Sequence, residues 1–426
     1  MKQYSEYKDS GVKWIGEIPS LWSTTRIKNI ATFNPSKTKE NKFIVGYAPM
    51  ECVRNGNIEA REIEISKISS GLTYFEEGDL VVAKVTPCFE NGNIAIARNL
   101  KNGCAYGSSE LFVFRCDKIV DKYLFFYMQD ERFKHKCCST MTGTGGLKRV
   151  SSEFIRNAYI TIPSSEEQQS IVNYLDTKVN KIDNYIATAE KEIAALDELK
   201  QVTIADAVTH GINPNAPMKD SGIPWIGMVP EHWEVNKIRS LFKLSNQKTK
   251  DPSCTLLSLS QYTGVRLKSE CDNVGMFEAE TTIGYNVVQK GQFVMNIMLA
   301  WNGSYSVSNY NGVISPAYCV FDFIRNCDKK YFDYLLRLKA YSGAFKTLSK
   351  GLIDSRLRLY PDYFRTFPIV FPPVEEQNEI VTYIDHKVAQ IDKVKASELA
   401  QIEKLKEYKQ RLISDVVTGK VKVTND

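Results

Sequence analysis

Two segments of the chain carry apolar residues every seventh position, with a second apolar residue three positions after each. The first pattern runs over 172–196 and the second over 381–412. This period marks the a and d positions along which two helices pack lengthwise, so it predicts a coiled coil. The predicted seam comprises Val172, Leu175, Val179, Ile182, Ile186, Ile193 and Leu196 in the first segment, and Val381, Ile384, Val388, Ile391, Ile402, Leu405 and Leu412 in the second.

Two polar residues interrupt the second seam. Lys395 stands at an a position and Glu398 at a d position. Polar residues at such positions fix the register or the partner at some cost in stability. An ordinary amphipathic helix with a solvated stretch explains the pattern equally well.

The two helices are expected to span 163–210 and 372–419. Each opens with proline followed by Glu-Glu-Gln, which places acidic residues at the positive end of the helix dipole. Gly211 and Gly419 follow the apolar patterns and suit the left-handed conformation that ends a helix. At 1.5 Å per residue, about 40 helical residues extend roughly 60 Å, which suggests a spacer.

The remaining sequence indicates two bodies of mixed α and β structure. Short apolar runs bounded by turn residues predict strands near 80–85, 93–98 and 111–115 in the first body, and near 287–296 and 317–322 in the second. A short helical segment follows the strands in each. The expected fold class is therefore α+β, with two globular domains separated by the long helices.

The chain is a tandem duplication. The stretch from Tyr7 to Trp22 shares nine of sixteen residues with that from Met218 to Trp233, and the two helix openings also match, at an offset of 209. The expected organisation is a first domain, 1–162, with a repeated head, 4–24; a first helix, 163–210; a linker, 211–217; a second domain, 218–371, with a head, 218–241; a second helix, 372–419; and a tail, 420–426.

Connectivity determines the expected topology. The second domain starts where the first helix ends, so a second helix that pairs with the first must run back toward the first domain. The helices should then be antiparallel and the domains pseudo-symmetric. By the same symmetry, each head should pack where its domain receives the end of the other repeat's helix, with the Trp14/Trp22 and Trp225/Trp233 pairs as packing anchors.

Composition describes a folded chain whose charge is unevenly distributed. Of 426 residues 43% are hydrophobic and 25% charged, and the formal net charge is +5. The segments 166–206 and 375–415 together carry −7, so the remainder carries +12. A basic pair of domains favours a nucleic-acid partner, although basic surfaces also aid solubility. The sequence has no signal-peptide pattern and no apolar run of about 18 residues, so we expect a cytoplasmic location without membrane contact.

Residue types that carry catalysis are scarce. The ten cysteines and four histidines lack zinc-ligand spacing, which favours free buried thiols over a metal site. Ser315-Pro-Ala-Tyr318 is close to an amino-methyltransferase motif but lacks its second proline and a preceding glycine-rich loop. Thr142-Gly-Thr-Gly-Gly146 lacks the lysine of a phosphate-binding loop and is better explained as a flexible or DNA-proximal loop.

The doubled head, the doubled Pro-x-x-Glu-Glu-Gln helix opening and the two-domain, two-helix plan resemble the specificity subunit of type I restriction-modification systems. The resemblance implies that each body is a target recognition domain reading one half of a bipartite, asymmetric sequence in double-stranded DNA. It implies that the helices set the spacer and dock two methylation subunits. The subunit itself would be non-catalytic, in a prokaryotic cytoplasm. S-adenosylmethionine, ATP and Mg would bind partner subunits, including the restriction subunits, and no cofactor or metal would bind this chain.

DNA contacts should come from basic or amide residues in the unlike bodies. The candidates are Lys84, Thr86, Asn91, Asn93, Lys148 and Arg149 in the first body, and Asn296, Trp301, Asn302, Lys350, Arg356 and Arg358 in the second. For each, the alternative is a solvated charge or a turn-forming asparagine. The aromatic cluster at 123–127 is expected in the core instead.

Two other functions compete with this interpretation. A structural scaffold would hold protein partners at the ends of the coiled coil without binding DNA. A stand-alone DNA methyltransferase or nuclease would need no partner subunit.

Overall fold

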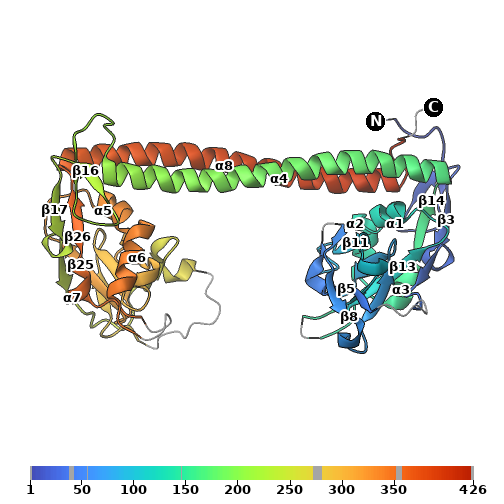
Figure 1. Ribbon diagram of the computed structural model, residues 1–426, viewed down its shortest axis with the longest axis horizontal. Helices are drawn as coiled ribbons and strands as arrows, with labels where there is room; N and C mark the ends of the chain where they lie inside the picture. The colour runs from blue at the N-terminus through green and yellow to red at the C-terminus, as the bar shows by residue number, and fades with distance from the viewer. Residues whose placement is uncertain are drawn as a thin grey trace. The chain divides into compact units, whose positions relative to one another are not determined.

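The computed structural model describes residues 2–37, 43–54, 56–144, 146–271, 281–351 and 357–423. Its contacts divide the chain into unit 1, Met1–Glu190 with Leu399–Asp426, and unit 2, Lys191–Glu398. Each unit holds one strand-rich body and part of both long helices (Figure 1). The units therefore cut across the division expected from the sequence, in which each long helix was a segment of its own.

The long helices are α4 (Ser165–His210) and α8 (Val374–Val417). The shorter helices are α1 (Asp121–Tyr127), α2 (Glu131–Cys138) and α3 (Ser152–Asn157) in unit 1, and α5 (Lys329–Leu336), α6 (Lys339–Leu348) and α7 (Pro361–Phe364) in unit 2. Single 3-10 turns are η1 (Ile27–Asn29), η2 (Met50–Cys52), η3 (Ile65–Lys67), η4 (Lys101–Gly103), η5 (Ile238–Ser240), η6 (Lys268–Glu270) and η7 (Ala300–Asn302).

The strands of unit 1 are β1 (Tyr7–Asp9), β2 (Glu17–Pro19), β3 (Ser23–Arg26), β4 (Ala31–Phe33), β5 (Ile44–Ala48), β6 (Val53–Arg54), β7 (Asn57–Ile58), β8 (Arg61–Glu64), β9 (Thr73–Glu76), β10 (Leu80–Ala83), β11 (Ile94–Ile96), β12 (Cys104–Gly107), β13 (Leu111–Cys116) and β14 (Tyr159–Ile162). Those of unit 2 are β15 (Met218–Asp220), β16 (Met228–Pro230), β17 (Glu234–Lys237), β18 (Phe242–Ser245), β19 (Leu257–Ser260), β20 (Gly264–Leu267), β21 (Asn286–Val288), β22 (Phe293–Asn296), β23 (Tyr305–Val307), β24 (Gly312–Ile314), β25 (Tyr318–Phe323) and β26 (Pro368–Phe371).

Each body contains its own four-stranded sheet, and the two sheets have the same topology; we call it the shared sheet. Its strand order is β11-β10-β13-β4 in unit 1 and β23-β22-β25-β18 in unit 2, and all neighbouring strands are antiparallel. The predicted strands and short helices are present in both bodies, except that the run 287–296 is divided by a turn into β21 and β22, which belong to different sheets. The mixed α and β content is confirmed. The sequence did not indicate that the bodies share a topology, because their side chains hardly align.

The second sheet of each body differs. Unit 1 has a four-stranded sheet, β8-β5-β12-β9, in which β5 and β12 are parallel. The described part of unit 2 has two-stranded sheets instead, β19-β20 and β21-β24. The two bodies therefore have the shared sheet in common and differ in the strands that surround it.

The core of each unit receives the end of a long helix. Ile413, Val416 and Val417 of α8 are fully buried in the core of unit 1, and Val208 of α4 is fully buried in that of unit 2. Burying an aliphatic side chain of this size contributes about 1.5–3 kcal/mol. The aromatic cluster at 123–127 lies in the core as predicted, with Phe125 at its edge.

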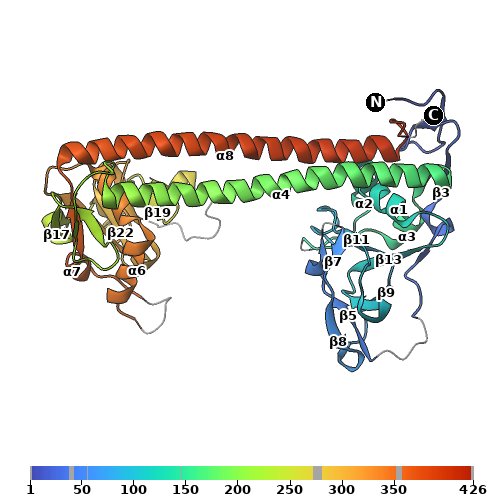
Figure 2. The ribbon, with the colours of Figure 1, turned by 45° about the horizontal axis from the view of Figure 1, so that its top comes forward.

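The long helices run in opposite directions within each unit, where they lie side by side (Figure 2). In unit 1, Lys409 Nζ lies 2.6 Å from Asp183 Oδ1. In unit 2, Lys200 pairs with Asp392 at 2.8 Å and Lys395 with Asp197 at 2.6 Å. As residue numbers rise along α4 they fall along α8. Each predicted seam residue is buried or partly buried.

The repeated heads are β-hairpins that hold the start of a long helix. In unit 1, the indole Nε1 of Trp22 donates to Oε2 of Glu167 at 2.9 Å, and the hydroxyl of Tyr4 donates to Oε1 at 2.6 Å. In unit 2, Nε1 of Trp233 donates to Oε2 of Glu376 at 3.0 Å. The two halves of the repeated motif are thus bonded to each other.

The same hairpins receive the end of the other helix. Gly419 follows α8 with φ +76°, and a Cβ there would lie 2.4 Å from Pro19 Cδ. Gly211 follows α4 with φ +77°, and a Cβ there would lie 3.4 Å from the Trp233 ring. The predicted packing of each head at a helix end is confirmed. The left-handed backbone favours glycine at both positions, and at Gly419 the close approach to Pro19 requires it as well.

Candidate nucleic-acid interface

Two loops meet at the same end of the shared sheet in each unit. The first, which we call the hairpin loop, joins β10 to β11 in unit 1 (84–93) and β22 to β23 in unit 2 (297–304). The second, which we call the bridge loop, is closed by an isolated β-bridge, between Thr142 and Arg149 in unit 1 and between Lys350 and Arg358 in unit 2.

In unit 1 the hairpin loop holds the bridge loop through Thr86. Its backbone N–H donates to the carbonyl of Lys148 at 2.9 Å, and its hydroxyl donates to that of Gly146 at 2.8 Å. The N–H of Lys148 donates back to the hydroxyl at 2.9 Å. Val150 N–H donates to the Lys84 carbonyl at 2.9 Å. Since Thr86 is buried, it positions the loop and leaves surface contacts to its neighbours.

Arg149 forms a two-point ion pair on this surface. Its Nε and Nη2 donate to Oε2 and Oε1 of Glu110 at 2.8 and 2.9 Å. These hydrogen bonds, helped by the charge of nearby Lys84, lower the pKa of Glu110 below its ordinary value, while burial opposes the shift. The pairing with Glu110 raises the pKa of Arg149.

The other unit 1 candidates differ in exposure. Lys148 is exposed, and Lys84 is partly buried with its Nζ 5.7 Å from the centre of the Phe112 ring. Asn91 is exposed and Asn93 is partly buried, and their backbone N–H groups close turns within the hairpin loop. The structure therefore brings all six predicted residues of the first body to one pair of loops.

The loop pair of unit 2 has the same backbone frame and different side chains. Leu359 N–H donates to the Ile297 carbonyl at 2.9 Å, just as Val150 does to Lys84. The ammonium of Lys350 lies 4.6 Å from the centre of the Tyr363 ring, and Lys350 and Arg358 are both exposed. Arg356, which the sequence also predicted, lies outside the described residues.

Trp301 and Asn302 lie in η7 of the unit 2 hairpin loop, against α6. Asn302 is exposed, whereas Trp301 is partly buried and donates from Nε1 to the Met298 carbonyl at 3.0 Å. Asn296 is buried, and its side-chain oxygen accepts from the N–H of Met298 at 2.9 Å. Asn296 therefore stabilises the turn from the interior, whereas its neighbours form the exposed surface.

Two functional candidates escaped the sequence analysis. Glu110 lies 39 residues before Arg149, and only the pairing of the shared sheet with the bridge loop brings them together. Lys346 of α6 lies 5.2 Å from the centre of the Trp301 ring. Nothing in the local sequence around either residue marks these contacts.

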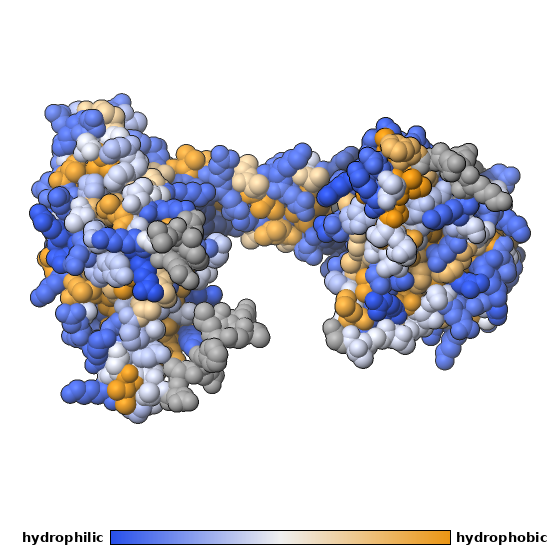
Figure 3. Space-filling model, turned by 60° about the horizontal axis from the view of Figure 1, so that its bottom comes forward, coloured by the Kyte–Doolittle hydropathy of each residue, from blue (hydrophilic) through white to orange (hydrophobic). Residues whose placement is uncertain are grey.

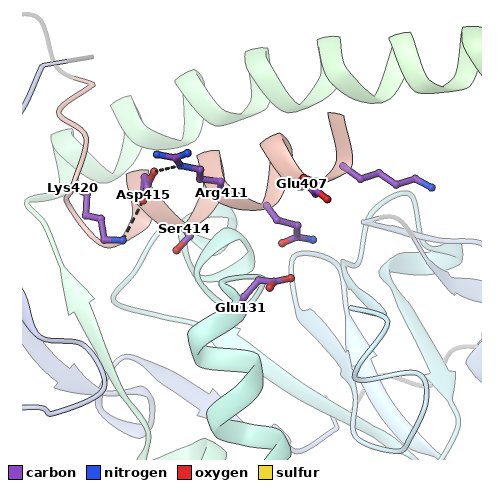
Figure 4. Close-up of a pocket in the computed structure, with 8 residues that line it drawn as sticks. Glu131, Glu407, Arg411, Ser414, Asp415 and Lys420 are labelled. Carbon is purple, nitrogen blue, oxygen red and sulfur yellow. Dashed lines mark hydrogen bonds and ion pairs between the residues drawn. The ribbon is translucent and has the colours of Figure 1, made fainter. Parts of the chain in front are cut away.

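A groove of about 610 Å³ lies elsewhere in unit 1, between α2 and the end of α8 (Figure 4). Glu131 lines it from α2, and Arg411, Asp415 and Lys420 line it from α8 and the residues that follow. Asp415 accepts a bond from Lys420 at 3.2 Å and lies 3.5 Å from Arg411. Because these charges are balanced within the groove, it lacks the basic excess that a polyanion requires.

All ten cysteines are free, and Cys104, Cys137 and Cys319 are buried. Burial raises the pKa of the Cys319 thiol to about 11. In the part of the chain that the structure describes, no cluster of three metal-ligating side chains occurs, and no helix is long and apolar enough to cross a membrane.

The fold and its paired loops define a duplicated α+β protein that presents two variable surfaces on a constant frame. The model of the type I restriction modification DNA specificity domain matches both halves, over 19–195 and 230–404, and the chain belongs to this family.

Individual relatives agree with the family match. The chain is 36% identical over 162 residues to the specificity subunit of the type I restriction enzyme EcoAI of Escherichia coli, covering 37% of this chain. The matched stretch spans 28% of that relative. The MjaVIII specificity subunit of Methanocaldococcus jannaschii is 27% identical over 334 residues, covering 72% of each chain.

Two solved structures share the fold. One chain from a study of complex assembly and conformational transition of the type I R-M system has a TM-score of 0.71 at 14% identity, covering 95% of this chain and 99% of that one. The HsdS subunit from Thermoanaerobacter tengcongensis has a TM-score of 0.52 at 17% identity, covering 95% and 98%.

Proposed function

We propose that this chain is the DNA-recognition subunit of a type I restriction-modification complex, in which each unit reads one half of a bipartite, asymmetric target in double-stranded DNA. The observation that carries the proposal is that both units present the same loop pair on the same sheet with different side chains. Lys84 and Glu110 of unit 1 correspond to Ile297 and Ala317 of unit 2, since the N–H of the first residue in each pair donates to the carbonyl of the second. Two domains with the same backbone arrangement and different exposed side chains can recognise two half-sites of different sequence.

The long helices are proposed to form an antiparallel coiled coil that sets the spacing between the two half-sites. The buried seam supports this, and the Lys395–Asp197 pair gives the polar seam position a cross-helix partner that specifies register. A helix of 46 residues extends about 69 Å, and DNA half-sites present equivalent faces only at defined separations.

The outer faces of the helices are proposed to dock two methylation subunits. Large apolar side chains are exposed there, and Figure 3 shows hydrophobic patches on the helices between hydrophilic ones. They are Tyr185, Leu199 and Val202 of α4 and Val394, Leu399 and Tyr408 of α8. Exposed apolar surface of this kind marks protein contacts. In this proposal the chain is non-catalytic; S-adenosylmethionine binds the methylation subunits, and ATP and Mg bind the restriction subunits.

Selection of sequences from random duplex DNA by the purified chain tests the proposal directly. The expected result is enrichment of two short fixed sequences at one constant spacing. Binding should also weaken steeply with salt, because lysine and arginine contacts release counterions from the phosphates. A scaffold for proteins alone would show no enrichment and no such slope, and that result would refute DNA recognition.

The rival of a stand-alone methyltransferase is tested with labelled S-adenosylmethionine. The chain alone should transfer no methyl group to its selected duplex. Transfer in the absence of any partner would contradict a non-catalytic role.

A further inference from the structure

We infer that Glu110 and Arg149 form a guanine-reading pair in the loop surface of unit 1. This inference rests on the proposed function and adds to it the base that one half-site must contain.

The geometry of the pair leaves one edge of the guanidinium available. Arginine carries five N–H groups in one plane. Glu110 accepts from Nε and from Nη2, and these donors form the side edge of the group. Among the described residues nothing accepts from Nη1 of Arg149, so the end edge, made by Nη1 and the second N–H of Nη2, keeps two parallel donors.

Two parallel donors match guanine. In the major groove guanine presents two adjacent acceptors, N7 and O6, whereas adenine presents an acceptor beside a donor. Arginine approaching end-on forms two hydrogen bonds with guanine alone. A carboxylate on the side edge fixes the plane of the guanidinium, so less side-chain entropy is lost on binding.

The surroundings keep the pair in place and accessible. The backbone of Arg149 bridges to Thr142 on one side and to Val85 on the other. The Arg149 side chain is 48% exposed and that of Glu110 is 26% exposed. The arginine therefore stands at the surface on a supported backbone, with its carboxylate partner partly shielded behind it.

The described residues of unit 2 do not form an equivalent pair. Arg358 occupies the place of Arg149, because each closes its bridge loop through a β-bridge. Ala317 occupies the place of Glu110: Ile297 N–H donates to its carbonyl at 3.3 Å, as Lys84 N–H does to that of Glu110 at 3.0 Å. An alanine side chain cannot accept hydrogen bonds from a guanidinium, so among the described residues this pairing of a carboxylate with the bridge-loop arginine occurs in unit 1.

The test compares sequences selected from random duplex by the full-length chain and by E110Q, R149A and the control E90Q. Glu90 is an exposed acid of the same hairpin loop. In the half-site of unit 1, the wild type and E90Q should prefer guanine at one position by about five- to 150-fold, the range of a good two-point base contact. E110Q and R149A should lose most of that preference and keep the other half-site unchanged. Replacing the guanine by 7-deazaguanine, which lacks N7, should weaken wild-type binding and leave R149A unaffected, because alanine has no donor for N7.

The outcomes separate this inference from the proposed function. If the wild type selects a bipartite sequence and E110Q selects it with the same guanine preference, the inference about Glu110 and Arg149 is wrong and the proposed function stands. Equal wild-type affinity for the 7-deaza duplex overturns that inference too. A wild type that enriches no sequence refutes DNA recognition itself.

Discussion

Trp22 and Glu167 lie 145 residues apart in the sequence, yet the indole of the first donates a hydrogen bond to the carboxylate of the second at 2.9 Å. Trp233 and Glu376 repeat the bond at 3.0 Å. In each unit a buried tryptophan from the head hairpin thereby fixes the first turn of the long helix that starts in that unit. The duplicated motif is a structural joint, which explains why it is shared by units that otherwise differ.

Glu167→Ala should lower the free energy of unfolding of unit 1 by about 2 kcal/mol, because it leaves a buried indole N–H without its charged acceptor. Urea denaturation followed by tryptophan fluorescence measures the loss. Glu166→Ala is the matched control, since Glu166 lies in the same helical turn and is exposed. Equal decreases in the free energy of unfolding in the two variants would show that the negative charge at the helix start stabilises the unit and that the Trp22–Glu167 hydrogen bond does not.

Inserting seven residues into each long helix, within the seam, should lengthen the spacer between the half-sites without changing either half-site. A heptad adds about 10.5 Å of helix and preserves the seam. DNA selection with the elongated chain measures the spacer. An unchanged spacer would contradict the proposed role of the helices as a ruler.

Thr86→Val should loosen the bridge loop of unit 1. The substitution removes the hydroxyl that donates to Gly146 and accepts from Lys148. Hydrogen exchange at the Lys148 amide should accelerate about fivefold or more, which corresponds to a bond worth about 1 kcal/mol. Thr142→Val, at an exposed position of the same loop, should leave that rate unchanged.

Asp333 should make the stability of unit 2 depend on pH. Burial raises its pKa above the ordinary value of 3.8, although Arg337 and the Val307 N–H oppose the shift. The folded state therefore holds the proton more tightly than the unfolded state. Stability is highest below the unfolded pKa and falls as pH rises through the folded one.

Asp333→Asn should flatten this slope, because the amide can still accept from the Val307 N–H, a bond of 2.7 Å in the wild type, and does not ionise. Urea denaturation at successive pH values above 3.8 measures the effect. Asp362→Asn, at an exposed position, should keep the wild-type slope. A slope that persists in Asp333→Asn would assign it to another group.

Features carried by local patterns were predictable from the sequence. The helix-opening motifs and the glycines that follow gave the ends of α4 and α8 to within two residues. The period of the seam indicated which face of each helix is buried. Gly211 and Gly419 marked the helix ends, since few other residues adopt their backbone conformation. Connectivity alone then indicated which head meets which helix end.

Features that depend on distant pairing were out of reach. The common sheet order of the bodies is invisible because many side chains fit the same antiparallel frame. Glu110 escaped notice because its partner lies in another loop, and Asn296 resembled a surface amide until β22 placed it in the interior. Six candidate residues of unit 1 do gather at one pair of loops, but Thr86 among them is buried, and the contacts that assign each residue its role are not encoded by sequence spacing.

The discontinuity of unit 1 sets the order in which the protein can be completed on the ribosome. Unit 2 is one continuous stretch, Lys191–Glu398, whereas unit 1 needs Ile413, Val416 and Val417 to fill its core. At synthesis rates of about 5–20 residues per second, the 208 residues between its two parts take roughly 10–40 s to synthesise. The amino-terminal body must wait through that interval with an open apolar slot, so the part of the chain made first is the part finished last.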